Sequence, residues 1–281
     1  MPSFPPMNDL CLVYLARART GIAPFQRFLD SLRRFPPGLP HDFVIVFKGF
    51  SSSSEVERWQ ALAADLAPQI LRMRDFGFDL RAYGLAARKC QNPWFCFLNS
   101  YSEPLAENWL AKMFAVMRRD GVGLVGATGS CESMYSNALL ERGTSPRPLP
   151  ISTALQLKLR ILFCARLFLP FPNPHVRTNA FILPREVMLR IWPGLILTKR
   201  GAYLFENGRN SMTRRVEQLK LKALLVGKDG LAYEQQNWLN SCTFRQGTQE
   251  NLLVADNQTR LYDSADLTIR ARLSHLAWGE A

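Results

Sequence analysis

The chain has 281 residues and a mass of 32.0 kDa, with 47% hydrophobic and 21% charged residues. This length suffices for one large domain or two small ones, and an apolar content that includes 18 Phe and 6 Trp excludes global disorder. With 35 Lys and Arg against 23 Asp and Glu, the net charge is +12, which favours a polyanionic partner: nucleic acid, an anionic membrane surface or a phosphorylated small molecule.

Targeting signals and cysteines point to a reduced, cytoplasmic protein. Residues 1–9 lack the basic and apolar segments of a secretory signal, and no run of 18 apolar residues predicts a transmembrane helix. The six cysteines form no C-x-x-C pair, so we expect reduced core residues. The predicted location is the cytoplasm, with peripheral attachment to the inner face of a membrane as an option.

The first 130 residues predict alternating strands and helices. Apolar runs predict strands at 10–15, 43–47, 94–98 and 122–126. Between them, apolar residues at helical spacing predict helices over 25–32, 56–70, 80–89 and 105–117. This β-α-β-α-β-α-β order predicts an α/β fold: a mostly parallel, Rossmann-like sheet flanked by helices, in a single domain.

The second half is less regular. Prolines at 146, 148 and 150 predict a boundary loop. Residues 151–171 are apolar and basic, which fits either a core helix or an interfacial helix on an anionic membrane. Further elements are predicted as a strand at 180–183, a helix from Pro184, a helix over 211–223 and a strand at 224–226.

Ligands of such sheets bind at the carboxyl ends of strands, here residues 16–20, 48–54 and 99–103. Polar residues follow the strand at 94–98, where Ser102 can either cap a helix or bind a ligand. Later in the chain, His175 and Arg177 precede a strand and can grip a phosphate, although an exposed polar loop is the alternative.

Two carboxylates are candidate general bases. Glu206 follows a short apolar run, as a base at a strand end would, or it belongs to a turn before a helix cap at Asn210 or Ser211. Asp229 also follows a strand, within a predicted turn.

The segment 238–260 is rich in Arg, Gln, Asn and Thr and is either a solvated tail or a cover over a nucleotide or acceptor. No Walker A, G-x-G-x-x-G, H-E-x-x-H or G-x-S-x-G motif occurs.

The order of these pieces over residues 10–230 resembles glycosyltransferases of the GT-A fold, in particular inverting family 2 and its bacterial polysaccharide relatives. Residues 78–87 are similar to the segment before the family's Asp-x-Asp signature, and residues 94–103 to the signature strand and turn. Residues 178–185 are similar to the acceptor-side strand, and Phe205 and Glu206 to the catalytic-base motif.

The resemblance implies a glycosyltransferase that moves a sugar from a nucleotide-sugar donor to a polysaccharide or lipid-linked acceptor, with inversion, in bacterial surface polysaccharide assembly. Residues 1–130 would form the nucleotide-sugar-binding half and residues 131–281 the acceptor-side half with a C-terminal segment. Glu206 would be the base, with Asp229 as runner-up. The implied donor-binding residues are Ala16, Arg17, Lys48, Asp79, Asn99, Ser100 and Tyr101. The implied phosphate and acceptor residues are His175, Arg177, Thr178, Asn179, Arg245 and Arg260.

One departure from the family concerns the metal. Where the family has two metal-binding Asp, this chain has Asn99 and Tyr101, so we predict donor binding without Mg²⁺ or Mn²⁺. The alternative is a metal held by Glu103 together with His175. Two other functions stay open: a non-catalytic nucleotide or sugar binder of the same fold, and a basic nucleic-acid-binding protein. The spread of the basic residues, without interleaved aromatic residues, disfavours nucleic acid as a partner.

Overall fold

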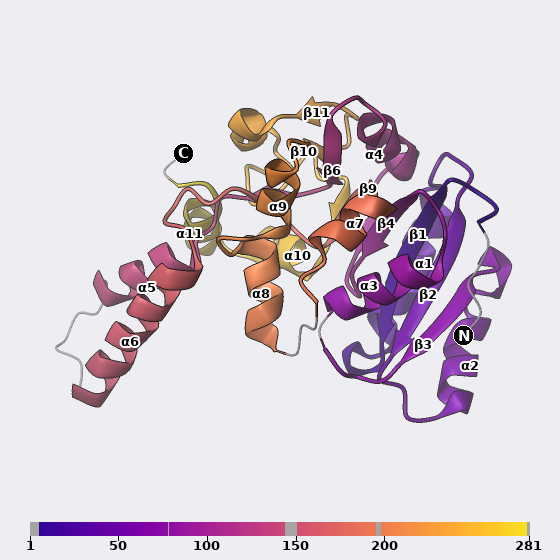
Figure 1. Ribbon diagram of the computed structural model, residues 1–281, viewed down its shortest axis with the longest axis horizontal. Helices are drawn as coiled ribbons and strands as arrows, with labels where there is room; N and C mark the ends of the chain where they lie inside the picture. The colour runs from indigo at the N-terminus through magenta and orange to yellow at the C-terminus, as the bar shows by residue number, and fades with distance from the viewer. Residues whose placement is uncertain (1–5, 78, 144–150, 195–197, 280–281) are drawn as a thin grey trace.

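A computed structural model describes residues 6–77, 79–143, 151–194 and 198–279. Its centre is a sheet of eight strands, with the order β11-β10-β6-β9-β4-β1-β2-β3 (Figure 1). The strands are β1 (Leu10–Arg17), β2 (Asp42–Lys48), β3 (Gln69–Met73), β4 (Trp94–Leu98), β6 (Val122–Gly126), β9 (Ala180–Pro184), β10 (Lys222–Val226) and β11 (Ala232–Tyr233).

The sheet is mostly parallel, as predicted. Only β9 and the edge strand β11 run antiparallel to their neighbours. β9 comes from the second half of the sequence and lies between β4 and β6 from the first half. Both halves therefore build one sheet and a single domain.

Helices cover both faces of the sheet. α1 (Ile22–Arg34), α2 (Ser53–Ala61) and α4 (Trp109–Met117) pack on one face, and α3 (Asp79–Lys89), α7 (Arg185–Ile191) and α9 (Met212–Gln218) on the other. Alternate residues of β1 enter the two cores: Leu12 and Tyr14 the first, Cys11 and Val13 the second. Burial on both faces explains why β1 is apolar throughout.

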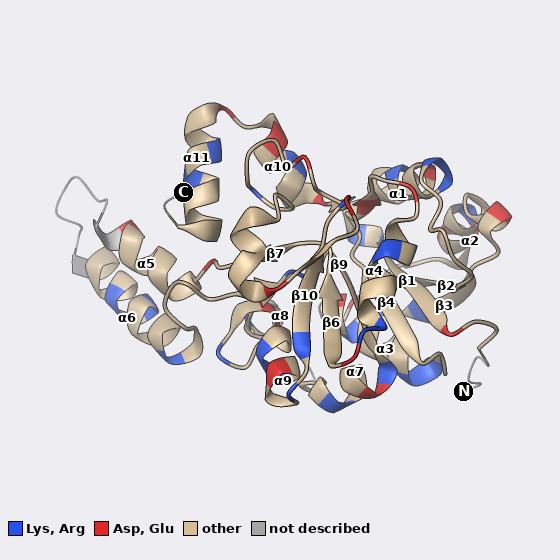
Figure 2. Ribbon diagram, turned by 90° about the horizontal axis from the view of Figure 1, so that it is seen from above, with Lys and Arg blue, Asp and Glu red and all other residues tan. Residues whose placement is uncertain are grey.

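The remaining elements lie around the carboxyl edge of the sheet and beyond it. α5 (Met134–Gly143) and α6 (Ile151–Leu167) stand away from the sheet, at the end opposite β3, in both views (Figures 1 and 2). α8 (Lys199–Asn207) lies between them and the body. The smaller elements are η1 (Ala18–Thr20), η2 (Ala64–Leu66), β5 (Glu103–Pro104), β7 (Gly129–Ser130), β8 (His175–Val176), η3 (Gln235–Asn240), β12 (Val254–Ala255), α10 (Asn257–Ser264) and α11 (Leu267–Trp278).

Within the described part of the chain, no helix is long and apolar enough to cross a membrane.

Two helix predictions were wrong in their extent. The helix predicted over 56–70 ends at Ala61, and residues 69–73 form strand β3. Pro68 lies at that boundary and cannot continue a helix, because it lacks the N–H and its ring clashes with the preceding turn. The helix predicted over 211–223 ends at Gln218, and the strand that follows it, β10, begins at Lys222.

The turn after β4 also differs from its prediction. Ser102 does not cap a helix, because residues 103–104 form β5 and α4 begins only at Trp109, after Asn108. The cap predicted at Ser211 is confirmed: its hydroxyl accepts a hydrogen bond from the Arg214 N–H, and α9 follows. The boundary loop predicted at prolines 146, 148 and 150 lies outside the described residues.

Candidate functional site

The sheet brings the predicted binding segments to one edge. Arg17 and Lys48 are register partners at the ends of β1 and β2. Asn99 follows β4, and Asn179 precedes β9, whose antiparallel direction puts its start at the same edge. The Asn99 N–H donates to the Asn179 carbonyl at 3.1 Å. This edge is where sheets of this kind bind their ligands.

A charged cluster occupies the edge over β1 to β3. Arg17 forms a hydrogen-bonded ion pair with Asp75, with 2.8 Å between Nη2 and Oδ1, and lies 3.8 Å from Asp79. The Lys48 ammonium donates to the Gly77 carbonyl and lies 4.0 Å from Asp75. Gly49 follows Lys48 at a φ of +80°, and a Cβ there would come within 2.7 Å of the Asp75 side chain. The cluster thus depends on a glycine at this turn.

Burial shifts the pKa values of two residues in this cluster. The Lys48 side chain is completely buried, and burial, reinforced by the nearby charge of Arg17, lowers its pKa to about 8. Burial raises the pKa of Asp79, although Lys48 and Arg17 act in the opposite direction. The carboxylate of Glu206 also raises the Asp79 pKa. Asp79 and Glu206 therefore lie within electrostatic range of each other.

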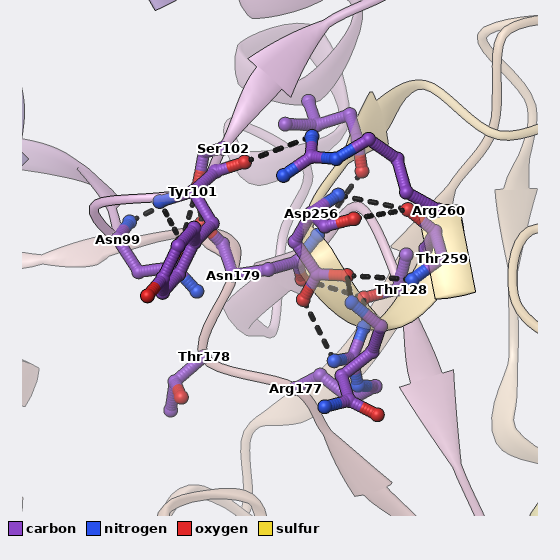
Figure 3. Close-up of polar contacts among 12 residues, drawn as sticks. Asn99, Tyr101, Ser102, Thr128, Arg177, Thr178, Asn179, Asp256, Thr259 and Arg260 are labelled. Atoms are coloured by element: carbon purple, nitrogen blue, oxygen red, sulfur yellow. Dashed lines mark hydrogen bonds and ion pairs between the residues drawn. The ribbon is translucent and has the colours of Figure 1, made fainter. Parts of the chain in front are cut away.

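The turn after β4 is held by hydrogen bonds and leaves one hydroxyl without a partner. Asn99 Oδ1 accepts from the Tyr101 N–H at 2.8 Å, and the Ser102 hydroxyl donates to the Asn179 carbonyl at 2.5 Å (Figure 3). The Ser100 carbonyl accepts from the Tyr14 hydroxyl at 2.9 Å. The buried Ser100 Oγ has no hydrogen-bond partner among the described residues, so it can bond to a ligand at this edge.

Arg177 belongs to a polar network over β6 and β9. Its Nη2 donates to Asp256 Oδ2 at 2.7 Å, its Nη1 lies 3.3 Å from Thr128 Oγ1, and its guanidinium stacks 4.0 Å above the Phe244 ring (Figure 3). The other oxygen of Asp256 accepts from the Gln258 and Thr259 N–H groups and so caps α10. Both terminal nitrogens of Arg177 are thus engaged.

The two arginines predicted from the C-terminal segment are also paired with carboxylates. Arg260 Nη1 donates to Glu103 Oε1 at 2.7 Å, and Arg27 donates to the same oxygen at 2.8 Å. Arg245 lies 3.6 Å from Glu132 and donates to the Gln258 side chain. The segment 238–260 is therefore no solvated tail: it folds back over the edge, and its strand β12 pairs with β5.

A pocket of about 250 Å³ collects several of the predicted residues. His175, Arg177, Glu206 and Arg245 line it, together with Asn207 and Phe244. Glu206 was predicted at a strand end, but it lies in the last turn of α8. Thr198 caps this helix, which ends before Gly208. Its Oε1 accepts a hydrogen bond from the Thr178 N–H at 3.0 Å, which fixes the carboxylate in the pocket.

The runner-up base lies elsewhere in the structure. Asp229 accepts hydrogen bonds from the Tyr233 hydroxyl at 2.6 Å and the Asn251 amide at 3.0 Å. It also accepts from the Leu231 N–H. These bonds hold a turn after β10, and Asp229 does not line the pocket around Glu206.

His175 is a neutral acceptor in this pocket. Its side chain is buried, and burial lowers its pKa to about 4. Nδ1 lies 2.8 Å from the Asn173 carbonyl, which places the proton on that nitrogen and leaves Nε2 as an acceptor. The predicted role, a donor to phosphate, does not fit this state. A hydroxyl group fits it, and the buried Asn207 Oδ1, which has no partner among the described residues, fits a hydroxyl in the same way.

The residues around the turn after β4 do not fit a divalent metal. Asn99 Oδ1 already accepts from Tyr101, and Glu103 is neutralised by Arg27 and Arg260. No group of three or more His, Cys, Asp or Glu side chains with metal-binding geometry occurs in the described parts of the chain. Mg²⁺ and Mn²⁺ favour carboxylate oxygens, and none is at hand here without a competing cation.

Sequence reasoning missed four residues that shape this edge: Asp75, Glu132, Asn207 and Asp256. For Asp256 a local signal existed, because it begins a capping box with Thr259, whose hydroxyl accepts from the Asp256 N–H at 2.8 Å. The ion pair between Asp256 and Arg177 had no such signal, since the two residues lie far apart in the sequence.

No protein-family model and no curated protein sequence matches this chain. Among solved structures, it is similar to a mannosyltransferase from Pyrobaculum calidifontis, solved with GDP-Man and Mn²⁺, at 14% identity and a TM-score of 0.47, over 84% of this chain and 59% of that one. A glucosyl-3-phosphoglycerate synthase from Mycobacterium tuberculosis is 12% identical with a TM-score of 0.37, over 64% and 57% of the two chains. GalNAc-T7, solved with UDP, GalNAc and Mn²⁺, is 13% identical with a TM-score of 0.47, over 77% and 41%.

This chain thus spans less than two thirds of the length of each of these structures. The mostly parallel, helix-flanked sheet that the sequence predicted is confirmed by the structure itself, and nothing in these likenesses singles out family 2. With TM-scores below 0.5, they leave the activity of this protein to be inferred from its own residues.

Proposed function

We propose that this protein is a glycosyltransferase that uses a nucleotide-sugar donor. One observation carries the proposal: the Glu206 carboxylate lies in a pocket within electrostatic range of Asp79, which belongs to the charged cluster that holds Arg17 and Lys48. A fixed carboxylate within range of a cluster that holds two cations, at the carboxyl edge of a mostly parallel sheet, suits a reaction between a hydroxyl and a phosphorylated sugar.

The donor is proposed to lie over β1, β2 and β4. Lys48 and Arg17 supply positive charge for the diphosphate, and Asp79 can accept hydrogen bonds from the ribose hydroxyls. The unpartnered hydroxyl of Ser100, flanked by Asn99 and Tyr101, offers a further polar contact. Ala16, which is buried at the end of β1, would lie against the base.

Glu206 is proposed as the general base. It takes the proton from the acceptor hydroxyl while that oxygen forms a bond to the anomeric carbon. The bond between that carbon and the diphosphate oxygen breaks, and the electron pair leaves with the nucleoside diphosphate. Lys48 and Arg17 stabilise the charge that develops there. Displacement in a single step inverts the configuration at the anomeric carbon.

The pocket around Glu206 is proposed to hold the acceptor sugar. Neutral His175 and Asn207 offer acceptor atoms to hydroxyl groups. The arginines on the other side are bound to Asp256 and Glu132, so the pocket suits neutral hydroxyls better than a phosphate. The Thr178 N–H supports it from the backbone through its hydrogen bond to Glu206, whereas the Asn179 carbonyl bonds to Asn99 and Ser102. A glycan or a lipid-linked sugar, as in the assembly of bacterial surface polysaccharide, is the proposed acceptor class.

A non-catalytic nucleotide-sugar binder is the second candidate. The observation that favours it is the turn after β4, where Asn99 and Tyr101 carry no charge and Glu103 is neutralised by two arginines. Such a protein would bind the donor through the same cluster without transferring the sugar.

Thermal denaturation with a panel of nucleoside diphosphates and their sugars tests both candidates. A ligand that binds only the folded state raises the melting temperature. The best ligand is then incubated with the protein and a panel of glycans, and release of nucleoside diphosphate is measured. Transfer that Glu206→Gln abolishes supports the transferase, and binding without release supports the second candidate. The absence of any shift in melting temperature would contradict both.

A further inference from the structure

α6 is apolar on two opposite sides, and only one of them is covered. Ile161 and Cys164 are buried on the side that faces the protein. The other side carries Leu155, Leu159 and Leu162, with 56%, 57% and 60% of their surface exposed. The spacing of these leucines puts them in one stripe along the helix. We call Leu155, Leu159 and Leu162 the leucine stripe.

The leucine stripe runs into a basic pocket. Arg166 lies four residues after Leu162, on the same side of α6, and lines a pocket of about 530 Å³ with Arg209 and Arg215. Leu167 of α6 and Phe205 of α8 also line it, and none of its described lining residues is acidic. We call this the basic pocket.

The charges of the basic pocket are not balanced by carboxylates. Arg209 donates to the Ala165 carbonyl at 3.1 Å, and Arg215 donates to the carbonyls of Asn210 and Ile191, both at 2.9 Å. Burial lowers the pKa of Arg215, and no neighbouring acid raises it again. Arg166 makes no hydrogen bond or ion pair with any described residue. The pocket therefore holds positive charge that an anion can neutralise.

Further cations surround the stripe. Lys158 is exposed on α6, and the Arg200 guanidinium, at the start of α8, lies 4.1 Å above the ring of Phe163. Figure 2 shows basic residues along α6, in the helix pair that stands away from the sheet. Glu141, an acidic residue on the neighbouring helix α5, is bound to Arg160 at 2.6 Å.

We propose that α6 docks on the surface of an anionic lipid bilayer, with the leucine stripe among the acyl chains and a lipid phosphate in the basic pocket. An apolar stripe flanked by cations is complementary to a surface that is apolar beneath and negative above. The 17 residues of α6 span about 25 Å along the surface. Because α5 and α6 stand away from the body, α6 can lie flat without a clash with the sheet (Figure 1).

This surface adjoins the proposed site without being part of it. Phe205 lines the basic pocket, and the next residue of α8, Glu206, lines the pocket at the sheet edge. A lipid held at the first pocket would present its headgroup beside the second. Docking itself needs neither donor nor turnover, so it can be tested independently of the proposed reaction.

The test is co-flotation with vesicles of phosphatidylcholine and phosphatidylglycerol in equal parts, against vesicles of phosphatidylcholine alone. The wild-type protein should bind the anionic vesicles at least about tenfold more tightly. Replacing the leucine stripe by serine (L155S, L159S and L162S together) should weaken binding about a hundredfold, since each half-buried leucine contributes about fivefold. The control replaces exposed leucines elsewhere, Leu231, Leu261 and Leu267, by serine and should bind like the wild type.

A second pair of variants separates the charges. Lys158→Gln combined with Arg166→Gln should weaken binding about 25-fold, about fivefold for each charge removed. Arg118→Gln with Arg119→Gln, exposed at the end of α4, lowers the net charge equally and should change binding less than twofold. An equal loss of vesicle binding in the two double variants would overturn the proposal, because general attraction by the net charge would then explain the binding.

Two other outcomes overturn it. One is wild-type protein that remains unbound at all vesicle concentrations. The other is sedimentation as a dimer that the leucine variant converts to a monomer, which would make the stripe an interface between copies of this chain. Nucleotide-induced shifts of the melting temperature should be the same in the leucine variant and the wild type, so a failure of docking is distinguishable from a failure of the proposed reaction.

Discussion

The carboxyl edge of the sheet has two ends, one over β1 to β3 and one over β6 and β9, and their charged side chains are stabilised in different ways. Over β1 to β3, the Lys48 ammonium is completely buried 4.0 Å from Asp75, and its pKa falls to about 8. Over β6 and β9, the Arg177 guanidinium is 2.7 Å from Asp256. At the first end, burial disfavours the charged form of Lys48, so a bound anion would stabilise that form. At the second end Asp256 compensates the charge of Arg177, and the acceptor atoms still available there, His175 Nε2 and Asn207 Oδ1, suit hydroxyl groups.

The largest expected effect concerns the acceptor end. Glu206→Gln keeps the shape of the side chain and removes the base, so turnover should fall about 10²–10⁴-fold while donor affinity stays nearly unchanged. Initial rates of transfer and a donor titration measure the two quantities. Asp229→Asn is the matched control, because that carboxylate only holds a turn. Activity of Glu206→Gln within a few-fold of the wild type would move the base to another residue.

The balance at the second end predicts a loss of stability when one charge is removed. Asp256→Asn leaves the largely buried Arg177 guanidinium without its carboxylate, and the free energy of unfolding should fall by about 3 kcal/mol. Urea denaturation measures it. Asp266→Asn removes an exposed carboxylate that caps α11 in the same manner, through the Ile269 N–H, and should cost less than about 1 kcal/mol. Equal losses would show that capping, not charge, explains Asp256.

His175 makes the stability of the same end depend on pH. Its pKa is about 4 in the folded protein and 6.5 in the unfolded chain, so the unfolded state binds a proton first as the pH falls. The contribution is complete above pH 6.5 and is lost towards pH 4, by about 3 kcal/mol in total. Denaturation across this range should show a steeper decline for the wild type than for His175→Asn, which keeps a donor to the Asn173 carbonyl. Parallel declines would contradict a neutral buried histidine.

The first end makes donor binding depend on pH in the alkaline range. Only the protonated Lys48 attracts a diphosphate, and its pKa is about 8. Affinity for a nucleoside diphosphate should therefore fall about tenfold between about pH 7 and pH 9. Calorimetric titrations measure it, with Lys48→Arg as the control that remains charged throughout. A flat profile for the wild type would separate Lys48 from the phosphates.

The smallest expected effect is that of metal removal. Because Glu103 is neutralised and Asn99 is hydrogen-bonded, EDTA should change neither donor affinity nor transfer. Loss of activity in EDTA that Mn²⁺ restores would show that Glu103 exchanges its arginines for a metal.

The sequence predicted the first end of the edge better than the second. Arg17, Lys48 and Asn99 directly follow apolar strands, and strand order then brings them together. Asp75 was missed because Pro68 was not recognised as the end of a helix, so β3 was not predicted. The predicted edge was otherwise confirmed by the sheet.

The second end depends on contacts that no local pattern encodes. Arg177 and Asp256 are 79 residues apart, and Arg260 and Glu103 are 157 apart. The phosphate roles predicted for Arg177, Arg245 and Arg260 treated them as unpaired cations, and only the fold shows which carboxylates they meet. The neutral state of His175 likewise follows from burial, which the polar residues around it in the sequence did not indicate.

The return of β12 to β5 has a consequence for synthesis on the ribosome. The sheet strands β1 to β10 are complete by residue 226, but Arg177 and Glu103 meet Asp256 and Arg260 only after a further thirty or so residues have been added. A nascent chain that has just completed β10 therefore has seven of the eight sheet strands, but still lacks Trp238 and Trp278 of one core and Leu253 of the other. It also carries Arg177 without its acid and Glu103 without Arg260. The pocket around Glu206, which Arg245 and Gln258 also line, can acquire its final shape only after these residues have been added, and a partner that recognises this pocket can bind only a chain whose synthesis has passed α10.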